Sequence, residues 1–383
     1  MKKSINHIYL IILLAILSSV APMGIDTYIP AIPTIATDLN VSIEKIELSL
    51  SIFLIGFSIG QVFGGPISDN FGRKNSSIFG LLAFSLFSFL IIFSTNIYEL
   101  WIYRFFEAFF GGIVVVNASA AVRDRFHGKE AAKIFSLIGT VRSLAPLLAP
   151  AIGSFIIHFY SWKAIFIFLT LYSLVVAFWV YKSLDESLNY IKQNVYQSFK
   201  LVLSHKEAMK IMITLGLAFS GFFILIAKSS FIFIEYFGIS TDAFPFFFGF
   251  NFVILIAMTR VNVALLKKYS PKELINIDII IQILSGLLFI LLYENISLIS
   301  TMLLMASYMS VMALIFGNSL AMALEYFPKN AGVASSVAGV LQFGLGAIIS
   351  SIALSFHNDS FLPIGISLTI ISLFSYFLIR RLK

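Results

Sequence analysis

The sequence contains no cysteine and very little charge. Of its 383 residues, 59% are hydrophobic and only 12% are Asp, Glu, Lys or Arg, and the mean hydropathy is +0.96. The absence of cysteine excludes disulfides, thiolate metal ligands and thiol catalysis. A soluble chain of this length carries about a quarter charged residues to keep its surface wet. The lower proportion here predicts a protein whose outer surface mostly faces lipid.

Twelve apolar runs have the length of a membrane-spanning helix, which needs about 20 residues to cross a hydrocarbon core of about 30 Å. We predict spans at 8–29, 46–66, 77–95, 98–121, 133–157, 162–183, 208–234, 245–266, 275–293, 296–324, 332–356 and 361–380. The first run is too long for a signal peptide and has no small-residue cleavage site, so we expect it to be retained. The predicted fold class is an all-α membrane protein.

The net charge of +7 is explained by membrane orientation and does not indicate a nucleic-acid partner. With both termini in the cytoplasm, most of the 26 Lys and Arg residues fall in cytoplasmic loops or helix ends, and only Lys45 and Lys163 fall outside. This asymmetry is the positive-inside pattern of multi-pass membrane proteins. We therefore expect both termini to be cytoplasmic.

A polar stretch in the middle of the chain divides the predicted spans into six and six. We expect an N-terminal bundle at 1–183, a cytoplasmic linker at 184–207 and a C-terminal bundle at 208–383. The apolar spacing in the linker suits an amphipathic helix on the membrane surface, and a simple tether is an equal alternative. The two halves also echo each other, with Gly139 matching Gly339, as expected of parallel repeats.

Four short motifs resemble a known family. GPISDNFGRK at 65–74 resembles the loop signature G-x-x-x-D-x-x-G-R-[KR] of the major facilitator superfamily. DTYIPAIP at 26–33, FLIGFSIGQ at 53–61 and LAPLLAP at 144–150 resemble its Bcr/CflA branch of drug/proton antiporters. The resemblance implies two six-helix bundles that export a drug-like small molecule across a bacterial inner membrane in exchange for protons. It also implies a monomer.

Enzymatic motifs are missing. The sequence contains neither H-E-x-x-H nor G-x-S-x-G, and its five histidines fall at span ends or in loops. We therefore expect no enzyme, no cofactor and no metal site.

The polar hairpin at 64–74, which we expect to be a short loop between the second and third spans, is predicted to be a conformational latch. Its residues are Gly65, Asp69, Gly72, Arg73 and Lys74. The glycines would let backbones approach closely and turn. By resemblance, Asp69 stabilises the outward-facing state by facing the other bundle. The alternative is that these charges only set topology, which would explain Arg73 and Lys74 but not Asp69.

Asp26, Arg104 and Glu107 are predicted to couple transport to protons. An ionised group at membrane depth costs about 2.5 to 3.5 kcal/mol, so each should face a cavity or a partner. Arg104 and Glu107 are three residues apart and share one helix face. By resemblance, Asp26 and Arg104 match the coupling acid and the arginine of the fourth span, whereas Glu107 replaces a usual Gln. Which acid takes the proton stays open, and so does snorkelling of Asp26 and Arg104 to the interface.

The substrate cavity is predicted to be strongly basic. Its expected lining residues are Asp26, Tyr28, Arg104, Glu107, Arg142 and Lys228. The cations among them favour an anionic substrate, for instance a self-made carboxylate siderophore. Internal pairing of Arg142 with an acid would remove that argument.

The fifth span carries a pattern that indicates the direction of transport. Gly139, Pro146, Pro150 and Gly153 resemble the antiporter signature, which bends this helix and packs it against the other bundle. The pattern favours export. A proton-coupled importer of the same fold, in which the prolines only serve packing, is the alternative.

Overall fold

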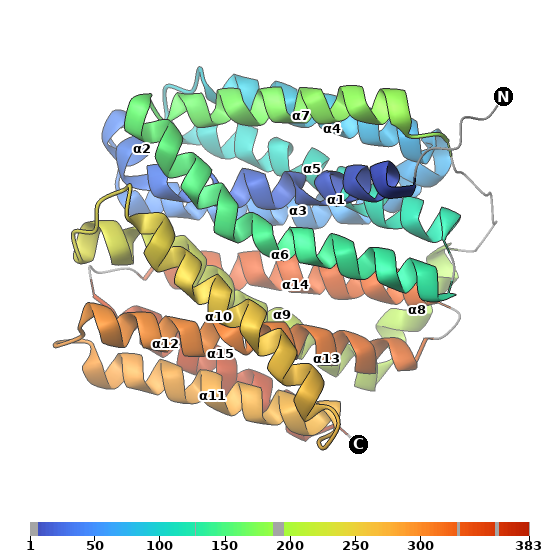
Figure 1. The fold of residues 1–383 in the computed structure, drawn as a ribbon. Coiled ribbons are helices and arrows are strands. Elements are labelled where there is room, and N and C mark those ends of the chain that lie inside the picture. The colour runs from blue at the N-terminus through green and yellow to red at the C-terminus, as the bar shows by residue number, and fades with distance from the viewer. Residues whose placement is uncertain (1–6, 127, 187–194, 328–329, 357–359, 383) are drawn as a thin grey trace. The chain divides into compact units, whose positions relative to one another are not determined.

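Most of the residues that the structure describes are helical (Figure 1). The computed structural model describes residues 7–126, 128–186, 195–327, 330–356 and 360–382, without the side chains of 7–8, 123, 128–133, 135–143, 195–196 and 331–332. It divides into two compact units between Ile191 and Lys192, within the stretch predicted to be the linker. We call residues Met1–Ile191 unit 1 and residues Lys192–Lys383 unit 2.

Unit 1 contains seven α-helices and one short 3₁₀ turn among its described residues. They are α1 (His7–Asp26), η1 (Ile29–Ala31), α2 (Ile32–Asp38), α3 (Ile43–Phe71), α4 (Arg73–Ile91), α5 (Ile97–Arg125), α6 (Gly128–Phe159) and α7 (Lys163–Ser183). The tightest helix pairs are α3 with α5 and α4 with α5, while α1 packs on α5 and α6. α5 therefore occupies the centre of this unit.

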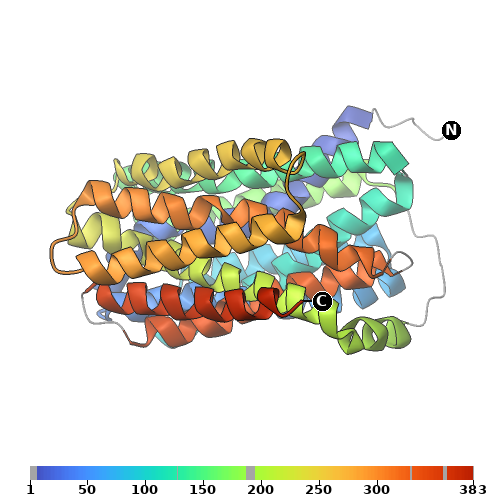
Figure 2. The same cartoon turned by 90° about the horizontal axis from the view of Figure 1, so that it is seen from below.

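Unit 2 has the same helical character in its described part. Its elements are α8 (Val195–Ser204), α9 (Lys206–Ser230), the π-helical turn η2 (Phe231–Tyr236), α10 (Phe244–Leu265), α11 (Pro271–Leu292), α12 (Leu298–Ser310), α13 (Met312–Glu325), α14 (Ala331–Leu354) and α15 (Leu362–Arg380). α9 packs against α14 and α15, and α11 packs against α15. Figure 2 shows α8, in yellow-green, outside the row of long helices where α9 begins.

The helices have the lengths and compositions that the predicted spans require. Eleven described helical segments are long and apolar enough to cross a membrane, and three of them, Tyr9–Asp38, Lys206–Tyr236 and Leu298–Glu325, join consecutive helical elements into one span. The twelfth helix is α6, which is 32 residues long and contributes the shorter described apolar run Leu144–Phe159. The all-α, multi-pass fold class is therefore confirmed.

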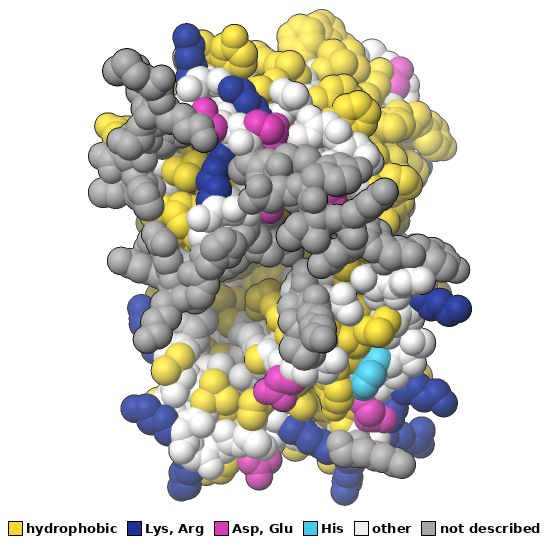
Figure 3. Space-filling view, turned by 90° about the vertical axis from the view of Figure 1, so that its right-hand side faces the viewer, with side chains coloured by type: hydrophobic (Ala, Val, Ile, Leu, Met, Phe, Trp, Pro, Cys, Tyr) yellow, Lys and Arg dark blue, Asp and Glu magenta, His cyan; other side chains and the backbone are white. Residues whose placement is uncertain are grey.

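Basic side chains gather at one end of each unit. In unit 1, Arg73 and Lys182 lie where α4 begins and α7 ends; in unit 2, Lys206, Lys268 and Arg380 lie where α9 begins and where α10 and α15 end. Figure 3 shows Lys and Arg side chains, in dark blue, on one face of the molecule. This clustering is what the positive-inside rule requires. The side of the membrane that the termini occupy stays a prediction.

The hairpin predicted at 64–74 is not a loop. α3 continues to Phe71 and α4 begins at Arg73, so Gly72 alone separates the two helices. Gly72 has a φ of 90° and its N–H bonds to the Ser68 carbonyl at 3.0 Å, which closes the last turn of α3. A residue with a side chain rarely adopts this backbone conformation. The polar residues of this stretch are compatible with helix, and only the glycine ends it.

Glycines bring α3 and α5 into backbone contact. A side chain at Gly56 would collide with the carbonyl oxygen of Phe105, and one at Gly60 with the carbonyl oxygen of Phe109. Gly112 of α5 returns the contact, because its missing side chain makes room for the backbone at Phe57. Small residues permit this close approach between membrane helices, where hydrophobic burial does not drive association.

We predict that Gly60→Leu strongly destabilises the protein, because the new side chain would force α3 and α5 apart. Overpacking of this kind costs about 1 to 3 kcal/mol or more. Thermal unfolding of the purified protein in detergent measures the effect.

Gly65→Leu provides the matched control, since a side chain at Gly65 would meet no described atom within 4 Å. Equal melting temperatures for the two variants would contradict the packing argument. We expected Gly65 to let two backbones approach closely. The open space around it shows that no such approach occurs within the described part of unit 1.

Candidate functional site

The centre of unit 1 holds a fully buried ion pair. Arg104 and Glu107 both lie on α5, and both side chains are 0% exposed. Arg104 Nη1 donates to Glu107 Oε2 at 2.7 Å and to the carbonyl oxygen of Gly24 on α1 at 2.9 Å. The second carboxylate oxygen of Glu107 accepts a bond from Ser88 Oγ of α4 at 2.6 Å. The three-residue spacing on one helix face therefore produces the contact that it predicted.

Aromatic rings surround the guanidinium of Arg104. Its central carbon lies 4.3 Å from the ring centre of Phe53, 4.6 Å from that of Tyr28 and 5.9 Å from that of Phe166. Each ring face offers negative charge to a cation within about 6 Å. Arg104 Nε and Nη2 are nonetheless buried without a hydrogen-bond partner among the described residues. The arginine thus has donors left for another acceptor.

Asp26 is the last residue of α1 and its side chain is only 3% exposed. Within the described part of the chain, its carboxylate makes no hydrogen bond or ion pair. Arg104 instead binds the carbonyl oxygen of Gly24, two residues earlier on the same helix. Glu107, and not Asp26, is therefore the acid that holds Arg104 in this structure. Both Asp26 and Arg104 are buried, so neither snorkels to a headgroup region here.

Tyr28 lies between the ion pair and α3. It is fully buried, and its hydroxyl lies 2.7 Å from Ser49 Oγ and donates to the carbonyl oxygen of Ile46 at 3.3 Å. Its ring faces the Arg104 guanidinium. Of the predicted cavity residues, Tyr28, Arg104 and Glu107 therefore lie together in one buried region of unit 1, and Asp26 is buried two residues before Tyr28.

The two other predicted cavity cations lie elsewhere. Lys228 is in the last turn of α9 in unit 2, is 2% exposed, and has its Nζ 5.2 Å from the ring centre of Phe231. The Arg142 side chain lies outside the described residues, as do the side chains around Gly139. Neither the pairing of Arg142 nor its part in a basic cavity is decided by the structure.

α6 runs continuously through both of its prolines and packs against α1. Pro146 and Pro150 lie inside the helix, where each removes one backbone hydrogen bond. A side chain at Gly153 would collide with the carbonyl oxygen of Thr27 and reach Pro30 at 3.0 Å. The glycine thus fits α6 against the segment that follows Asp26. Packing of this helix against the other bundle stays a prediction.

The predicted latch residues form a hydrogen-bonded cluster at the basic end of unit 1. The guanidinium of Arg73 donates to Asp69 at 2.5 Å, to Asp124 at the end of α5 at 2.9 Å and to Ser68 at 2.7 Å. The Asp69 side chain is 52% exposed. Lys74 places its ammonium 5.3 Å from the ring centre of Tyr181 on α7. Asp69 therefore pairs with Arg73 while keeping a free face toward solvent.

The start of α4 is capped by a residue that the sequence did not reveal. Glu186, which follows α7, accepts the backbone N–H of Arg73 at 2.7 Å and that of Lys74 at 3.2 Å. A carboxylate is favourable at a helix N-terminus because it meets unpaired N–H groups and the positive end of the dipole. A side chain at Gly72 would occupy the position of this carboxylate. Glu186, which lies outside the hairpin, therefore caps α4.

Two buried acids also escaped the prediction. Glu47 of α3 is 0% exposed, and Asp278 of α11 is 3% exposed. Each lies inside a run that was predicted to span the membrane, so the signal was an acidic residue surrounded by aliphatic ones. Glu186 gave no such signal, because its contact with Arg73 joins residues 113 positions apart.

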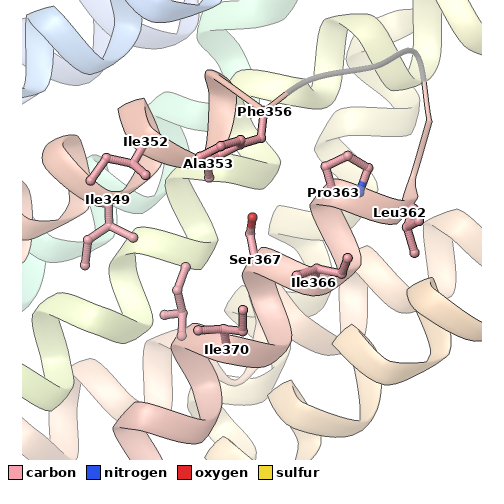
Figure 4. Close-up of a pocket in the computed structure, with 10 residues that line it drawn as sticks. Ile349, Ile352, Ala353, Phe356, Leu362, Pro363, Ile366, Ser367 and Ile370 are labelled. Atoms are coloured by element: carbon pink, nitrogen blue, oxygen red, sulfur yellow. The ribbon is translucent and has the colours of Figure 1, made fainter.

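A groove between α14 and α15 lies on unit 2. Its volume is about 510 Å³, and its lining includes Ile352, Phe356, Pro363 and Ile370, with Ser367 as a polar member (Figure 4). Three of these side chains are also exposed large hydrophobics. Such a lining suits hydrocarbon chains, and it contains none of the ionisable residues discussed above.

We predict that Glu107→Gln destabilises unit 1, because the substitution leaves the charge of Arg104 buried without a counter-ion. Breaking a buried pair in this way costs about 3 to 5 kcal/mol. The double variant Arg104→Gln/Glu107→Gln removes both charges and should lose less stability than the sum of the two single variants. Melting temperatures of all three variants in detergent, evaluated as a double-mutant cycle, measure the coupling.

Glu235→Gln is the control for Glu107→Gln, since Glu235 is an exposed glutamate. Should Glu107→Gln melt at the temperature of this control, the buried pair would have no structural importance.

Comparison with known proteins connects this geometry to a family. The sequence model of the Major Facilitator Superfamily matches residues 14–351. The chain is 32% identical to a bicyclomycin resistance protein homolog of Haemophilus influenzae, covering 97% of each chain. It is 26% identical to the multidrug resistance protein MdtL of Klebsiella pneumoniae, covering 84% of this chain and 82% of MdtL.

The fold also matches solved structures. The crystal structure of a D-xylose-proton symporter aligns with a TM-score of 0.80 at 18% identity, covering 97% of this chain and 98% of the symporter. A partially occluded inward-open structure of the xylose transporter XylE from E. coli aligns with a TM-score of 0.75 at 15% identity, covering 97% of both chains. Identities this low establish the fold alone. Together with the sequence matches, they show that the chain belongs to the Major Facilitator Superfamily of membrane transporters, on its Bcr/CflA-type branch, and is not an enzyme.

Proposed function

We propose that this transporter is a proton-coupled exporter, an antiporter that moves a small molecule out across the bacterial inner membrane by alternating access. The observation that carries the proposal is the buried pair of Arg104 and Glu107, with the buried acid Asp26 in the same region of unit 1. A paired acid and base inside a membrane protein have two arrangements, because protonating the acid removes its attraction for the base. Such a pair can link proton binding to a conformational change.

The order of events follows from the charges. Protonation of Glu107 would weaken its bond to Arg104 and free the guanidinium for another acceptor. The released arginine would then bind Asp26, a buried acid two residues after the Gly24 whose carbonyl oxygen already accepts a bond from Arg104. Exchange of Arg104 between the two acids would accompany the movement of the bundles between inward-open and outward-open states. In this scheme Glu107 gains the proton when Asp26 loses it.

The names of the relatives support a drug-like cargo. The Haemophilus influenzae homolog is named for bicyclomycin resistance and MdtL for multidrug resistance. The alternative cargo is a self-made anionic metabolite such as a carboxylate siderophore. The specific observation in its favour is Lys228, whose ammonium lies in the buried part of unit 2.

The direction of transport rests on α6. Pro146, Pro150 and Gly153 match the antiporter pattern of the branch, and Gly153 packs against the chain next to Asp26. The D-xylose-proton symporter shares the fold at 18% identity, which gives no argument for import by this chain. Counterflow in vesicles of both orientations would separate an exporter from a proton-coupled importer.

We predict that Asp26→Asn abolishes proton-driven export while leaving exchange without a gradient intact, because the amide cannot release or bind the proton. Inverted membrane vesicles, energised by an inward-acid pH gradient and loaded from outside with ethidium as a cationic probe, measure the first activity. Ethidium counterflow without a gradient measures the second and shows that the variant is folded.

Asp242→Asn is the control for Asp26→Asn, because Asp242 is an exposed aspartate in unit 2. Undiminished gradient-driven transport by Asp26→Asn would remove this acid from the coupling scheme.

We predict that Lys228→Ala weakens transport of an acidic probe far more than that of a cationic probe, because only the former gains from a buried ammonium. Fluorescein and ethidium serve as the two probes in the same vesicles. Lys267→Ala, which removes an exposed lysine, is the control. Equal losses of transport activity for the two probes would refute the hypothesis of an anionic cargo.

A further inference from the structure

α11 buries a polar face inside the apolar core of unit 2. Asp278, Gln282 and Ser285 follow one another at intervals of four and three residues, and all three are buried. This spacing places them on one side of the helix. Asp278 is 3% exposed and Gln282 is 0% exposed, and most of the residues between and after them on α11 are aliphatic. A polar stripe of this kind inside a membrane protein is costly unless it binds something.

Two oxygen atoms of this stripe have no partner. Asp278 Oδ2 and Gln282 Oε1 are both buried, and neither has a hydrogen-bond partner in the described part of the chain. The amide nitrogen of Gln282 is engaged, since it donates a long bond of 3.5 Å to the carbonyl oxygen of Tyr308 on α12. That bond directs Nε2 toward α12 and leaves Oε1 as an acceptor. Leaving a buried acceptor unsatisfied costs about 1 to 3 kcal/mol.

The described residues of the neighbouring helices bring no counter-ion to Asp278. α11 packs against α15, α13 and α12. On α15, Arg380 is exposed and donates to the hydroxyl of Tyr376 at 3.1 Å. On α12, the hydroxyl of Tyr308 lies 3.3 Å from Ser372 Oγ. On α13, the ionisable residue is Glu325, which is exposed at the last position of the helix.

The ionisable residues of α11 itself are also engaged elsewhere. Lys272 Nζ donates to the carbonyl oxygen of Leu382 at 2.7 Å. Glu273 is exposed and accepts the N–H of Ser270 at 2.8 Å, which caps the start of the helix. No ion pair of Asp278 therefore occurs among the described residues, and its charge has no compensation.

A single proton satisfies both oxygen atoms. Bound to Asp278, it turns one carboxyl oxygen into an O–H donor, and Gln282 Oε1, one helical turn away on the same face, is an acceptor without a partner. We propose that Asp278 and Gln282 form a reversible proton-binding site inside unit 2, separate from Asp26 and Glu107. Only its use in transport rests on the proposed antiport; the binding of the proton does not.

The position of the site gives protons a route. Asp278 is seven residues after Pro271, the first residue of α11, which corresponds to about 10 Å along the helix axis. Pro271 lies at the end of unit 2 that carries the basic residues. Water at that end is therefore within two helical turns of the carboxyl group. An exchange of protons with one side of the membrane follows from this placement.

We predict that Asp278→Asn removes a band of a protonated carboxyl group from the infrared spectrum of the purified transporter. In the wild type, the same band should weaken reversibly as the pH is raised from about 5 to about 9, because the carboxyl group then releases its proton. Asn is nearly isosteric with Asp and its amide can donate to Gln282 permanently, so we expect this variant to fold. Asp242→Asn, which changes an exposed aspartate, should leave the band in place.

Gln282→Leu gives a second and independent measurement. This variant keeps Asp278 but removes the proposed acceptor, so the carboxyl band should persist and move to higher frequency as its hydrogen bond is lost. Identical spectra for the wild type and Asp278→Asn, or a band that does not change with pH, would overturn the proposal.

The proposed antiport and the proposed proton site can be refuted independently of each other. Wild-type transport of ethidium without any response to a pH gradient would refute antiport and leave the band unchanged. Gradient-driven transport in a protein that lacks the Asp278 band would refute the proton site and leave antiport standing.

Discussion

An ionised side chain inside hydrocarbon needs a partner, and this requirement determines how unit 1 is built. Arg104 meets it with the carboxylate of Glu107, the carbonyl oxygen of Gly24 and three aromatic rings from α3, the η1 region and α7. Each of these contacts comes from a different part of the chain. The four helices that carry them are therefore held around one charge, which accounts for the position of α5 at the centre of the unit.

Close helix packing makes this arrangement possible. Gly56 and Gly60 let the backbone of α3 approach α5, and Phe53, one turn before Gly56, then reaches the guanidinium of Arg104. On the other side, Gly153 lets α6 approach the segment after Asp26. Packing and electrostatics are thus coupled, because a larger residue at any of these glycines would move the groups that neutralise the arginine.

Much of the fold could be predicted because a lipid environment constrains sequence strongly. The apolar runs identified the spans, and the three-residue spacing of Arg104 and Glu107 predicted their contact. The prediction of a loop at 64–74 was wrong. Polar residues alone do not end a helix, and only Gly72 interrupts it here. Polar residues at a membrane surface can remain helical, because water satisfies their side chains and the helix satisfies their backbone.

The candidate site was less predictable for the opposite reason. Helical spacing relates residues on one helix, but the partners of a buried charge come from other helices. Nothing in the order of residues showed that Arg104 would bind the carbonyl oxygen of Gly24 and not the carboxylate of Asp26, or that Glu186 would cap α4. Asp278 was visible as an acid among isoleucines, but only its packing showed that Gln282 has an unpaired oxygen beside it on the same face.

The amino-acid sequence by itself determined the membrane environment, the helices and the family, because hydropathy and short motifs depend on residues that are close together in the chain. The tertiary structure alone decided which acid holds Arg104, which carboxylate caps α4 and which buried oxygen atoms remain unsatisfied. Those outcomes depend on distances between helices, and such distances are set by how side chains pack, which local sequence does not specify.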